Sequence, residues 1–142
     1  MNIRDFDVLY FYPRAGRPGQ PMLPGWDRIP GARGCTPQSC AFRDRSAELS
    51  TLGVRVAGLS AQSLDDQVEF AERNRMPFPV ISDEWLDLAR DPGRPTFDVE
   101  GFTLYKRLAL VAERGEIVKV FYPVFPPQRN AQDVLDWLEA NR

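Results

Sequence analysis

The chain has 142 residues and a mass of 16.2 kDa, a size that suits one domain with one hydrophobic core. Its residues are 43% hydrophobic and 27% charged, which excludes disordered, fibrous and membrane-spanning classes. The net charge of −2 gives no electrostatic reason to expect a nucleic-acid or membrane partner. The lack of histidine excludes Ser-His-Asp triads and imidazole zinc sites. Two cysteines, Cys35 and Cys40, are too few for a four-thiolate cage or a disulfide-rich secreted scaffold, so we expect no metal.

The first predicted element is a strand over Val8–Tyr12, a continuous β-branched and aromatic run that ends at Pro13. Such a run is typical of a strand buried on both faces of a sheet. Asp5 and Asp7 precede it, and the run is far shorter than the apolar core of a signal peptide or a membrane span. We therefore expect a cytoplasmic protein, in a reducing compartment where a close cysteine pair is more often catalytic than structural.

The next segment, about residues 14–34, is rich in proline and glycine and is predicted to be an irregular loop long enough to carry function. It contains Trp26, which we interpret either as a loop anchor packed on the core or as a lid or docking anchor. A helix is predicted after the loop. Thr36 is its expected N-cap, Pro37 its first helical residue and Gly53 its C-terminal stop.

The rest of the chain alternates between strand-like runs and helical periodicity. The expected elements are a strand at 54–59, a helix at 63–75 with an apolar stripe of Leu64, Val68 and Ala71, and a strand at 78–81. They continue with a short helix that carries Trp85 and ends at Asp91-Pro92-Gly93, strands at 104–112 and 116–122 joined at Arg114-Gly115, and a helix at 131–141. The stretch 121–127 is interpreted as a strand end beneath that last helix, or as an exposed aromatic patch. This order predicts a mixed central β-sheet flanked by helices, in one α/β domain.

The two cysteines flank the start of the first predicted helix. A thiolate at Cys35 would be stabilised by the helix dipole and by unpaired backbone N–H groups, and Arg33 and Arg43 would add positive charge. Cys40 lies five residues later, so on an intact helix the axial rise alone is about 7.5 Å. That exceeds the Cα separation of roughly 7 Å that a disulfide tolerates, so bonding requires the first turn to unwind. The alternative is an ordinary loop thiol and a small buried residue, with a zinc or iron–sulfur site the weakest interpretation.

Several segments resemble the peroxiredoxins, and most closely the class called peroxiredoxin Q or bacterioferritin comigratory protein. The segments are Leu9-Tyr10-Phe11-Tyr12-Pro13, then Gly34-Cys35-Thr36, Cys40-Ala41-Phe42-Arg43-Asp44, Phe78-Pro79-Val80-Ile81-Ser82-Asp83, and the hairpin from Arg107 to Gly115. The resemblance extends from about Val8 to the final helix. It implies a thioredoxin-like fold, with residues 1–142 as a single domain and an insertion at about 14–34.

The resemblance also implies a reaction. Cys35 would be the peroxidatic thiolate that reduces hydrogen peroxide or an alkyl hydroperoxide and becomes a sulfenic acid. Cys40 would condense with it to an intramolecular disulfide, which thioredoxin or a glutaredoxin-like dithiol would reduce. The family needs no metal or organic cofactor. For this chain we expect a monomer or a weak homodimer.

The family's remaining site residues are matched unevenly. Pro13 would line the substrate pocket. Arg107 is the best match for the arginine that stabilises thiolate and peroxide, although an ungapped count selects Lys106, and a solvent-facing strand residue is the other interpretation of Arg107. A family threonine three residues before the peroxidatic cysteine is replaced by Arg17 or, counted back directly, by Ala32.

This departure keeps two further functions open. One is a thioredoxin-fold thiol–disulfide oxidoreductase acting on a protein disulfide. The other is a non-enzymatic redox-sensing module, in which disulfide formation unwinds the helix and reshapes the loop.

Overall fold

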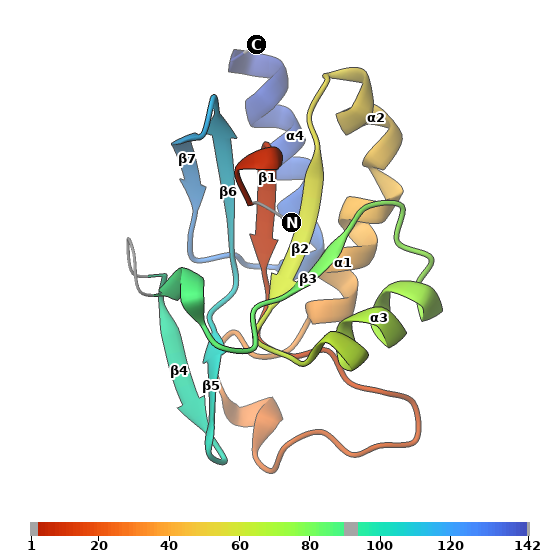
Figure 1. The fold of residues 1–142 in the computed structure, drawn as a ribbon, viewed down its shortest axis with the longest axis vertical. Coiled ribbons are helices and arrows are strands. Elements are labelled where there is room, and N and C mark those ends of the chain that lie inside the picture. The colour runs from red at the N-terminus through yellow and green to blue at the C-terminus, as the bar shows by residue number, and fades with distance from the viewer. Residues whose placement is uncertain (1–2, 90–93, 142) are drawn as a thin grey trace.

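A five-stranded sheet forms the centre of the molecule (Figure 1). The structure, a computed structural model, describes residues 3–89 and 94–141. The strand order is β3-β2-β1-β6-β7, with β1 (Val8–Phe11), β2 (Val56–Ser60), β3 (Val80–Ser82), β6 (Leu108–Glu113) and β7 (Glu116–Phe121). β1 pairs parallel with β2 and antiparallel with β6, so the sheet is mixed, as predicted.

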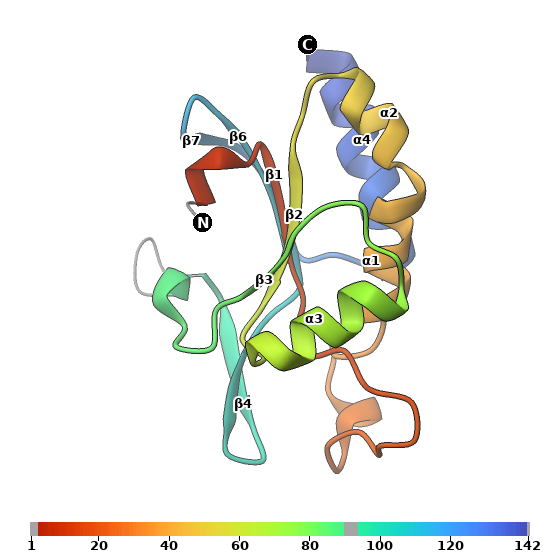
Figure 2. The same ribbon diagram turned by 45° about the vertical axis from the view of Figure 1, so that its right-hand side comes forward.

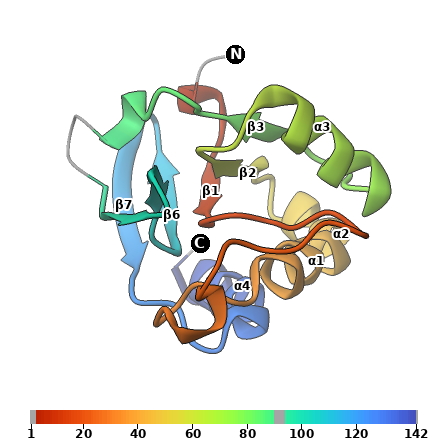
Figure 3. The same cartoon turned by 90° about the horizontal axis from the view of Figure 1, so that it is seen from below.

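Helices cover one face of this sheet (Figure 3). They are α1 (Cys35–Asp44), α2 (Ser46–Thr51) and α4 (Asn130–Asn141), while α3 (Leu64–Arg73) lies beside β3. All four residues of β1 are buried, with Val8 and Tyr10 in the core under these helices and Leu9 and Phe11 in a second core on the other face. This confirms the prediction of a strand buried on both faces. In the part of the chain that the structure describes, no helix has the length and apolar character needed to span a membrane.

A second, smaller layer lies below the sheet (Figure 2). It consists of the hairpin β4 (Thr96–Val99) and β5 (Phe102–Tyr105) together with the long loop and its short 3-10 helix η2 (Trp26–Arg28). Trp26, Ala32 and Leu104 form a small apolar cluster of their own between loop and hairpin. Trp26 is therefore a loop anchor packed in a core, one of its two predicted roles.

Two predicted elements differ from the structure. The expected strand at 104–112 is two strands, β5 and β6, because Lys106 and Arg107 leave the ladder between them, and the β4–β5 hairpin was not predicted. The expected short helix after Ser82 is only the 3-10 turn η3 (Asp87–Ala89), with Trp85 outside it and 77% exposed. The predicted break at 91–93 falls outside the described residues.

The predicted buried face of α3 is wrong. Leu64 and Val68 are 63% and 46% exposed, whereas Gln67 and Phe70 are buried. Gln67 is buried because its amide donates to the Ile81 carbonyl and accepts from the Tyr12 hydroxyl. A hydrophobic pattern cannot predict a glutamine that fills a core position through long-range hydrogen bonds. The predicted N-cap of α3, Ser63, is confirmed by its hydrogen bond from the Asp66 N–H.

The start of α1 is also displaced from its prediction. The helix begins at Cys35 itself and Gly34 is the N-cap, so Thr36 is not a cap and Pro37 is the third helical residue. Gly34 has φ +105°, a left-handed conformation that favours glycine. A Cβ at Gly34 would also lie 2.5 Å from the Pro127 ring, too close for any side chain. The helix is interrupted at Arg45, where α1 ends and α2 begins.

Candidate active site

The sheet brings three distant segments to one end of the molecule. Phe11, the last residue of β1, pairs with Leu108, the first residue of β6. Arg107 therefore leaves the sheet beside the point where the chain enters the long loop. The loop then returns to begin α1 with Cys35, so thiol and guanidinium meet at the same end.

Cys35 occupies the first turn of α1 and is 5% exposed. Backbone N–H groups in a first helical turn have no intrahelical partner, and they carry the positive end of the helix dipole. The Cys35 thiol donates to the Ala32 carbonyl at 3.7 Å. The sulfur is therefore buried at the end of α1 that carries the positive pole of the helix dipole.

Arg107 provides the positive charge at this position. Its side chain is 4% exposed, and its Nη2 donates to Cys35 Sγ at 3.3 Å. The same nitrogen donates to the carbonyls of Gly31, Ala32 and Arg33 at 3.3, 3.1 and 2.9 Å. The end of the loop thus forms a cradle of carbonyl oxygens around the guanidinium. The interpretation of Arg107 as a solvent-facing strand residue is wrong.

The other predicted cations lie elsewhere. Lys106 is exposed and its backbone N–H donates to Pro95. Arg33 contributes its carbonyl to the Arg107 cradle, while its exposed side chain pairs with Asp27 at 3.4 Å. Among the predicted cations, only Arg107 is hydrogen-bonded to the Cys35 sulfur.

Gln38 is a buried part of the site that the sequence analysis missed. It accepts from Arg107 Nη1 at 2.6 Å and donates to Asn130 Oδ1, at the start of α4, at 3.0 Å. Gln38 lies three residues after Cys35, a spacing that puts both side chains on one face of the helix. The spacing could have indicated from the sequence that Gln38 lies beside Cys35. No sequence pattern indicates its partners Arg107 and Asn130, which are 69 and 92 residues away.

Cys40 lies in the second half of α1 and is partly exposed. Its thiol donates to Asn74 Oδ1 at 3.8 Å, and Arg43 donates to the Asn74 backbone carbonyl at 2.8 Å. Both cysteines are free thiols on an intact helix. Sequence reasoning did not find this contact, because Asn74 lies at the end of α3, 34 residues after Cys40.

The two candidate replacements for the family threonine lie apart. Ala32 is fully buried, and its carbonyl accepts from both Cys35 and Arg107. Arg17 forms an ion pair with Asp66 on α3, with Nη2 and Oδ1 2.8 Å apart. Ala32 therefore lies beside the thiol through its backbone carbonyl, and its methyl group packs with Trp26 and Leu104.

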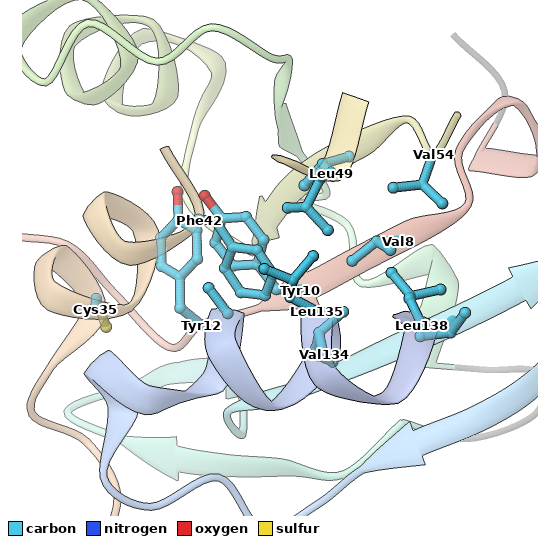
Figure 4. Close-up of a cluster of buried hydrophobic side chains, with 14 of the residues drawn as sticks. Val8, Tyr10, Tyr12, Cys35, Phe42, Leu49, Val54, Val134, Leu135 and Leu138 are labelled. Atoms are coloured by element: carbon cyan, nitrogen blue, oxygen red, sulfur yellow. The ribbon is translucent and has the colours of Figure 1, made fainter. Parts of the chain in front are cut away.

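Tyr10 of β1 and Tyr12, the residue that follows the strand, lie beneath α1 (Figure 4). The Tyr10 ring stacks on Phe42 with centroids 4.4 Å apart, and the Tyr12 hydroxyl donates to Gln67. Burial raises the pKa of both tyrosines well above the usual value for a phenol. They are neutral at physiological pH and act as packing under the thiols.

Two predicted features lie near the site without a contact that assigns them a role. Pro13 is buried two residues after the end of β1, and its part in a substrate pocket stays a prediction. In the stretch 121–127, Phe125 is 88% exposed and Pro127 packs against Gly34. Within the described residues, no group of three or more Cys, Asp or Glu side chains is placed to hold a metal ion.

Comparison with known proteins defines the class. Residues 6–135 match the redoxin family, so the chain belongs to that family. Its fold is thioredoxin-like: the structure of peroxidoxin BcpB from Mycobacterium tuberculosis is 27% identical, with a TM-score of 0.75 over 95% of this chain and 79% of that one.

Within the redoxin family the chain groups with the peroxiredoxin Q or bacterioferritin comigratory protein class. Chloroplastic peroxiredoxin Q of Sedum lineare is 31% identical over 94% of this chain and 63% of its own length. Xanthomonas campestris bacterioferritin comigratory protein shares the fold, with 22% identity and a TM-score of 0.74 over 95% of this chain and 77% of that one. The chain spans only 54–63% of the first curated relatives that it matches.

Proposed function

We propose that this protein is a thiol-dependent peroxidase in which Cys35 is the peroxidatic nucleophile, Cys40 the resolving thiol and Arg107 the stabilising cation. The observation that carries the proposal is the 3.3 Å contact between Arg107 Nη2 and Cys35 Sγ at the buried start of a helix. A guanidinium and helix N–H groups favour the thiolate, and the thiolate is the form that attacks an oxygen atom. The peroxiredoxin names of its relatives support the same reaction.

The proposed cycle has three steps. The Cys35 thiolate attacks the terminal oxygen of a hydroperoxide, the O–O bond breaks, and the leaving oxygen takes a proton to become water or an alcohol. Cys35 is then a sulfenic acid, which the Cys40 thiolate attacks with loss of water to form the Cys35–Cys40 disulfide. A dithiol such as thioredoxin or a glutaredoxin-like protein gives two electrons and two protons to restore both thiols.

The second step requires movement of α1. Cys35 and Cys40 are five residues apart on an intact helix, an axial rise of about 7.5 Å. A disulfide needs Cα atoms within roughly 7 Å, so the first turn must unwind before the sulfur atoms meet. The hydrogen bonds that Arg107 and Gln38 form at that turn would then break.

Stopped-flow oxidation tests the proposal. Wild-type Cys35 should react with hydrogen peroxide orders of magnitude faster than a free small-molecule thiol. Cys40→Ser should keep that first step and accumulate a sulfenic acid that dimedone traps. Oxidation of Cys35 no faster than that of the small thiol would refute the proposal.

Thiol–disulfide exchange is the second candidate function. It is favoured by the methyl group of Ala32, which leaves no hydroxyl at the place where the family has a threonine. Rapid reduction of a protein disulfide, without accelerated reaction with peroxide, would assign this function. Oxidation that changes partner binding without turnover would instead assign the redox-sensing role.

We also propose that the protein works in the cytoplasm as a monomer or weak homodimer. A close cysteine pair in a reducing compartment is more often catalytic than structural, which agrees with the role proposed for Cys35 and Cys40. Fractionation and light scattering test the two statements separately.

A further inference from the structure

The outer face of α3 carries apolar side chains that no described element covers. Leu64 and Val68 are one helical turn apart and are 63% and 46% exposed. Trp85, 77% exposed, continues this surface, because a surface groove is lined by Leu64, Trp85 and β3 between them. We refer to Leu64, Val68 and Trp85 as the α3 face.

Carboxylates without cationic partners surround the α3 face. Asp65, Glu72 and Glu84 are exposed and form no ion pair within the described part of the chain. The nearby Asp66 and Glu69 are neutralised by Arg17 and Arg73. The surface therefore combines exposed apolar groups with net negative charge at its rim, which suits a partner with an apolar contact surface and lysine or arginine around it.

The same charges argue against two other occupants. In a symmetric contact between two copies, each acidic rim would meet the other, which is repulsive. A β-strand of a partner that paired with the edge of β3 would find few backbone N–H and C=O groups free to form hydrogen bonds. Pro79 has no N–H, and the Ile81 carbonyl already accepts from Gln67.

The resolving thiol lies near the C-terminal end of α3, the helix that carries most of this face. α3 runs from β3 towards α1 (Figure 2), and its C-cap, Asn74, accepts from the Cys40 thiol. Val68 precedes Asn74 by six residues, about 9 Å along the helix. A standard protein interface of about 800 Å² per partner has a radius of about 16 Å, so a partner centred on Val68 would reach Cys40.

The second half of α1 keeps Cys40 at this place when the first turn unwinds. Phe42 is fully buried against Tyr10, and Arg43 is hydrogen-bonded to Asn74. The disulfide would therefore form by movement of Cys35 towards Cys40, beside the end of α3. Cys40 is also the more exposed of the two cysteine residues.

We propose that the α3 face is the docking surface for the protein dithiol that reduces the Cys35–Cys40 disulfide, a thioredoxin-type protein that would present an apolar contact surface with lysine or arginine at its rim. This inference rests on the proposed peroxidase function. A thiolate of the docked protein attacks Cys40 Sγ, and the S–S bond breaks with Cys35 leaving as the thiolate that Arg107 stabilises. The second thiol of the partner attacks the mixed disulfide, which releases Cys40 as a thiol and the partner as a disulfide. Two electrons and two protons thus pass from the partner to this chain.

Steady-state peroxide turnover with two reductants tests the inference. Val68→Lys places a cation on the α3 face and Glu72→Lys places one at its rim, and for each we expect about a tenfold rise in the KM for thioredoxin. Turnover with dithiothreitol, which needs no docking surface, should be unchanged in both variants. The matched controls are Val120→Lys and Glu116→Lys on β7, where Val120 is 49% exposed and the strand is the opposite edge of the sheet.

The outcomes separate the docking surface from the reaction itself. A KM for thioredoxin that is equal in wild type and all four variants would overturn the inference while dithiothreitol turnover leaves the peroxidase proposal standing. Dithiothreitol turnover without any thioredoxin turnover would overturn it as well. The inference would also be overturned if the wild type is a dimer that Val68→Lys dissociates without a change in the KM for thioredoxin. The α3 face would then be an interface between two copies of this chain. Loss of peroxide reduction with both reductants in the wild type would instead refute the peroxidase.

Discussion

The two halves of α1 hold their cysteines in different ways. In the first turn Cys35 is buried, and the turn is fixed by polar contacts from other elements: Arg107 at the sulfur and Asn130 through Gln38. In the second half Cys40 is partly exposed, and the backbone is fixed by the packing of Phe42 on Tyr10.

Because of this difference, we expect α1 to unwind at its first turn while its second half stays folded. Hydrogen bonds to a thiolate weaken when the sulfur loses its charge as a neutral sulfenic acid, whereas apolar packing is indifferent to that change. Oxidation of Cys35 would therefore loosen the first turn and leave the second half in place. The predictions below alter one half at a time, from the largest effect to the smallest.

Removal of the packing under the second half should have the largest effect on stability. Phe42→Ala should lower the free energy of unfolding by about 3–5 kcal/mol, because it removes a fully buried ring and leaves a cavity beside Tyr10. Urea denaturation of the reduced protein measures this. Phe125→Ala, at an 88% exposed ring, is the control and should change it by less than about 0.5 kcal/mol. Equal losses in the two variants would contradict the assignment of Phe42 as the anchor.

Removal of the charge at the first turn should have the largest effect on reactivity. Arg107→Met should slow the reaction of Cys35 with hydrogen peroxide by about 10²–10³-fold, the usual effect of losing a preorganised donor at a developing charge. Stopped-flow kinetics measures the rate, and Lys106→Met, at the exposed neighbouring residue, should leave it unchanged. A rate within threefold of wild type for Arg107→Met would remove the arginine from the mechanism.

Removal of the Gln38 amide, which links the first turn of α1 to α4, should have a smaller effect. Its effects on the reaction with peroxide and on disulfide formation should be opposite in sign. Gln38→Leu leaves Arg107 Nη1 and Asn130 Oδ1 without the partner that they share, which should cost about 1–3 kcal/mol of stability. The looser turn should react with peroxide more slowly but form the Cys35–Cys40 disulfide faster. Mass spectrometry of quenched samples separates the two rates.

A matched pair of variants distinguishes this role from general destabilisation. Gln38→Glu can still accept from Arg107 and should restore slow disulfide formation. Gln132→Leu, which removes a partly exposed glutamine that donates to Asp136 on α4, should alter neither rate. Slower disulfide formation in Gln38→Leu would contradict the idea that Gln38 holds the turn closed.

The sequence predicts features that depend on apolar packing better than features that depend on polar contacts. The run Val8–Tyr12 predicts a strand buried on both faces because each residue carries its own apolar signal, and the order of elements predicts the mixed sheet. Cys35, Cys40 and Arg107 were identified by resemblance to a known family, and the structure brings Arg107 to Cys35. Their catalytic roles stay predictions.

What could not be predicted depends on partners far away in the sequence. Gln38 and Gln67 are buried and Asn74 is partly buried, all with hydrogen bonds across the fold, whereas a pattern of apolar spacing treats these polar residues as solvent-facing. The same limitation explains the reversed face of α3. The stripe of Leu64 and Val68 has helical spacing but lies on the outside, because Gln67 and Phe70 occupy the inside.

The smallest predicted effect appears only at alkaline pH. Burial raises the pKa of Tyr10, Tyr12 and Tyr105 above the unfolded value near 10, so these phenols keep their protons in the folded state after the unfolded chain has lost them. Their contribution to stability is fully present below pH 10 and is lost as the pH rises further, by up to about 1.4 kcal/mol per pH unit for each tyrosine. Tyr10→Phe keeps the ring stack on Phe42 and removes one of the three groups. Urea denaturation between pH 9 and 11.5 should therefore show about a third less decline in the variant, and an unchanged slope would mean that the Tyr10 hydroxyl reaches solvent when the second half of α1 is folded.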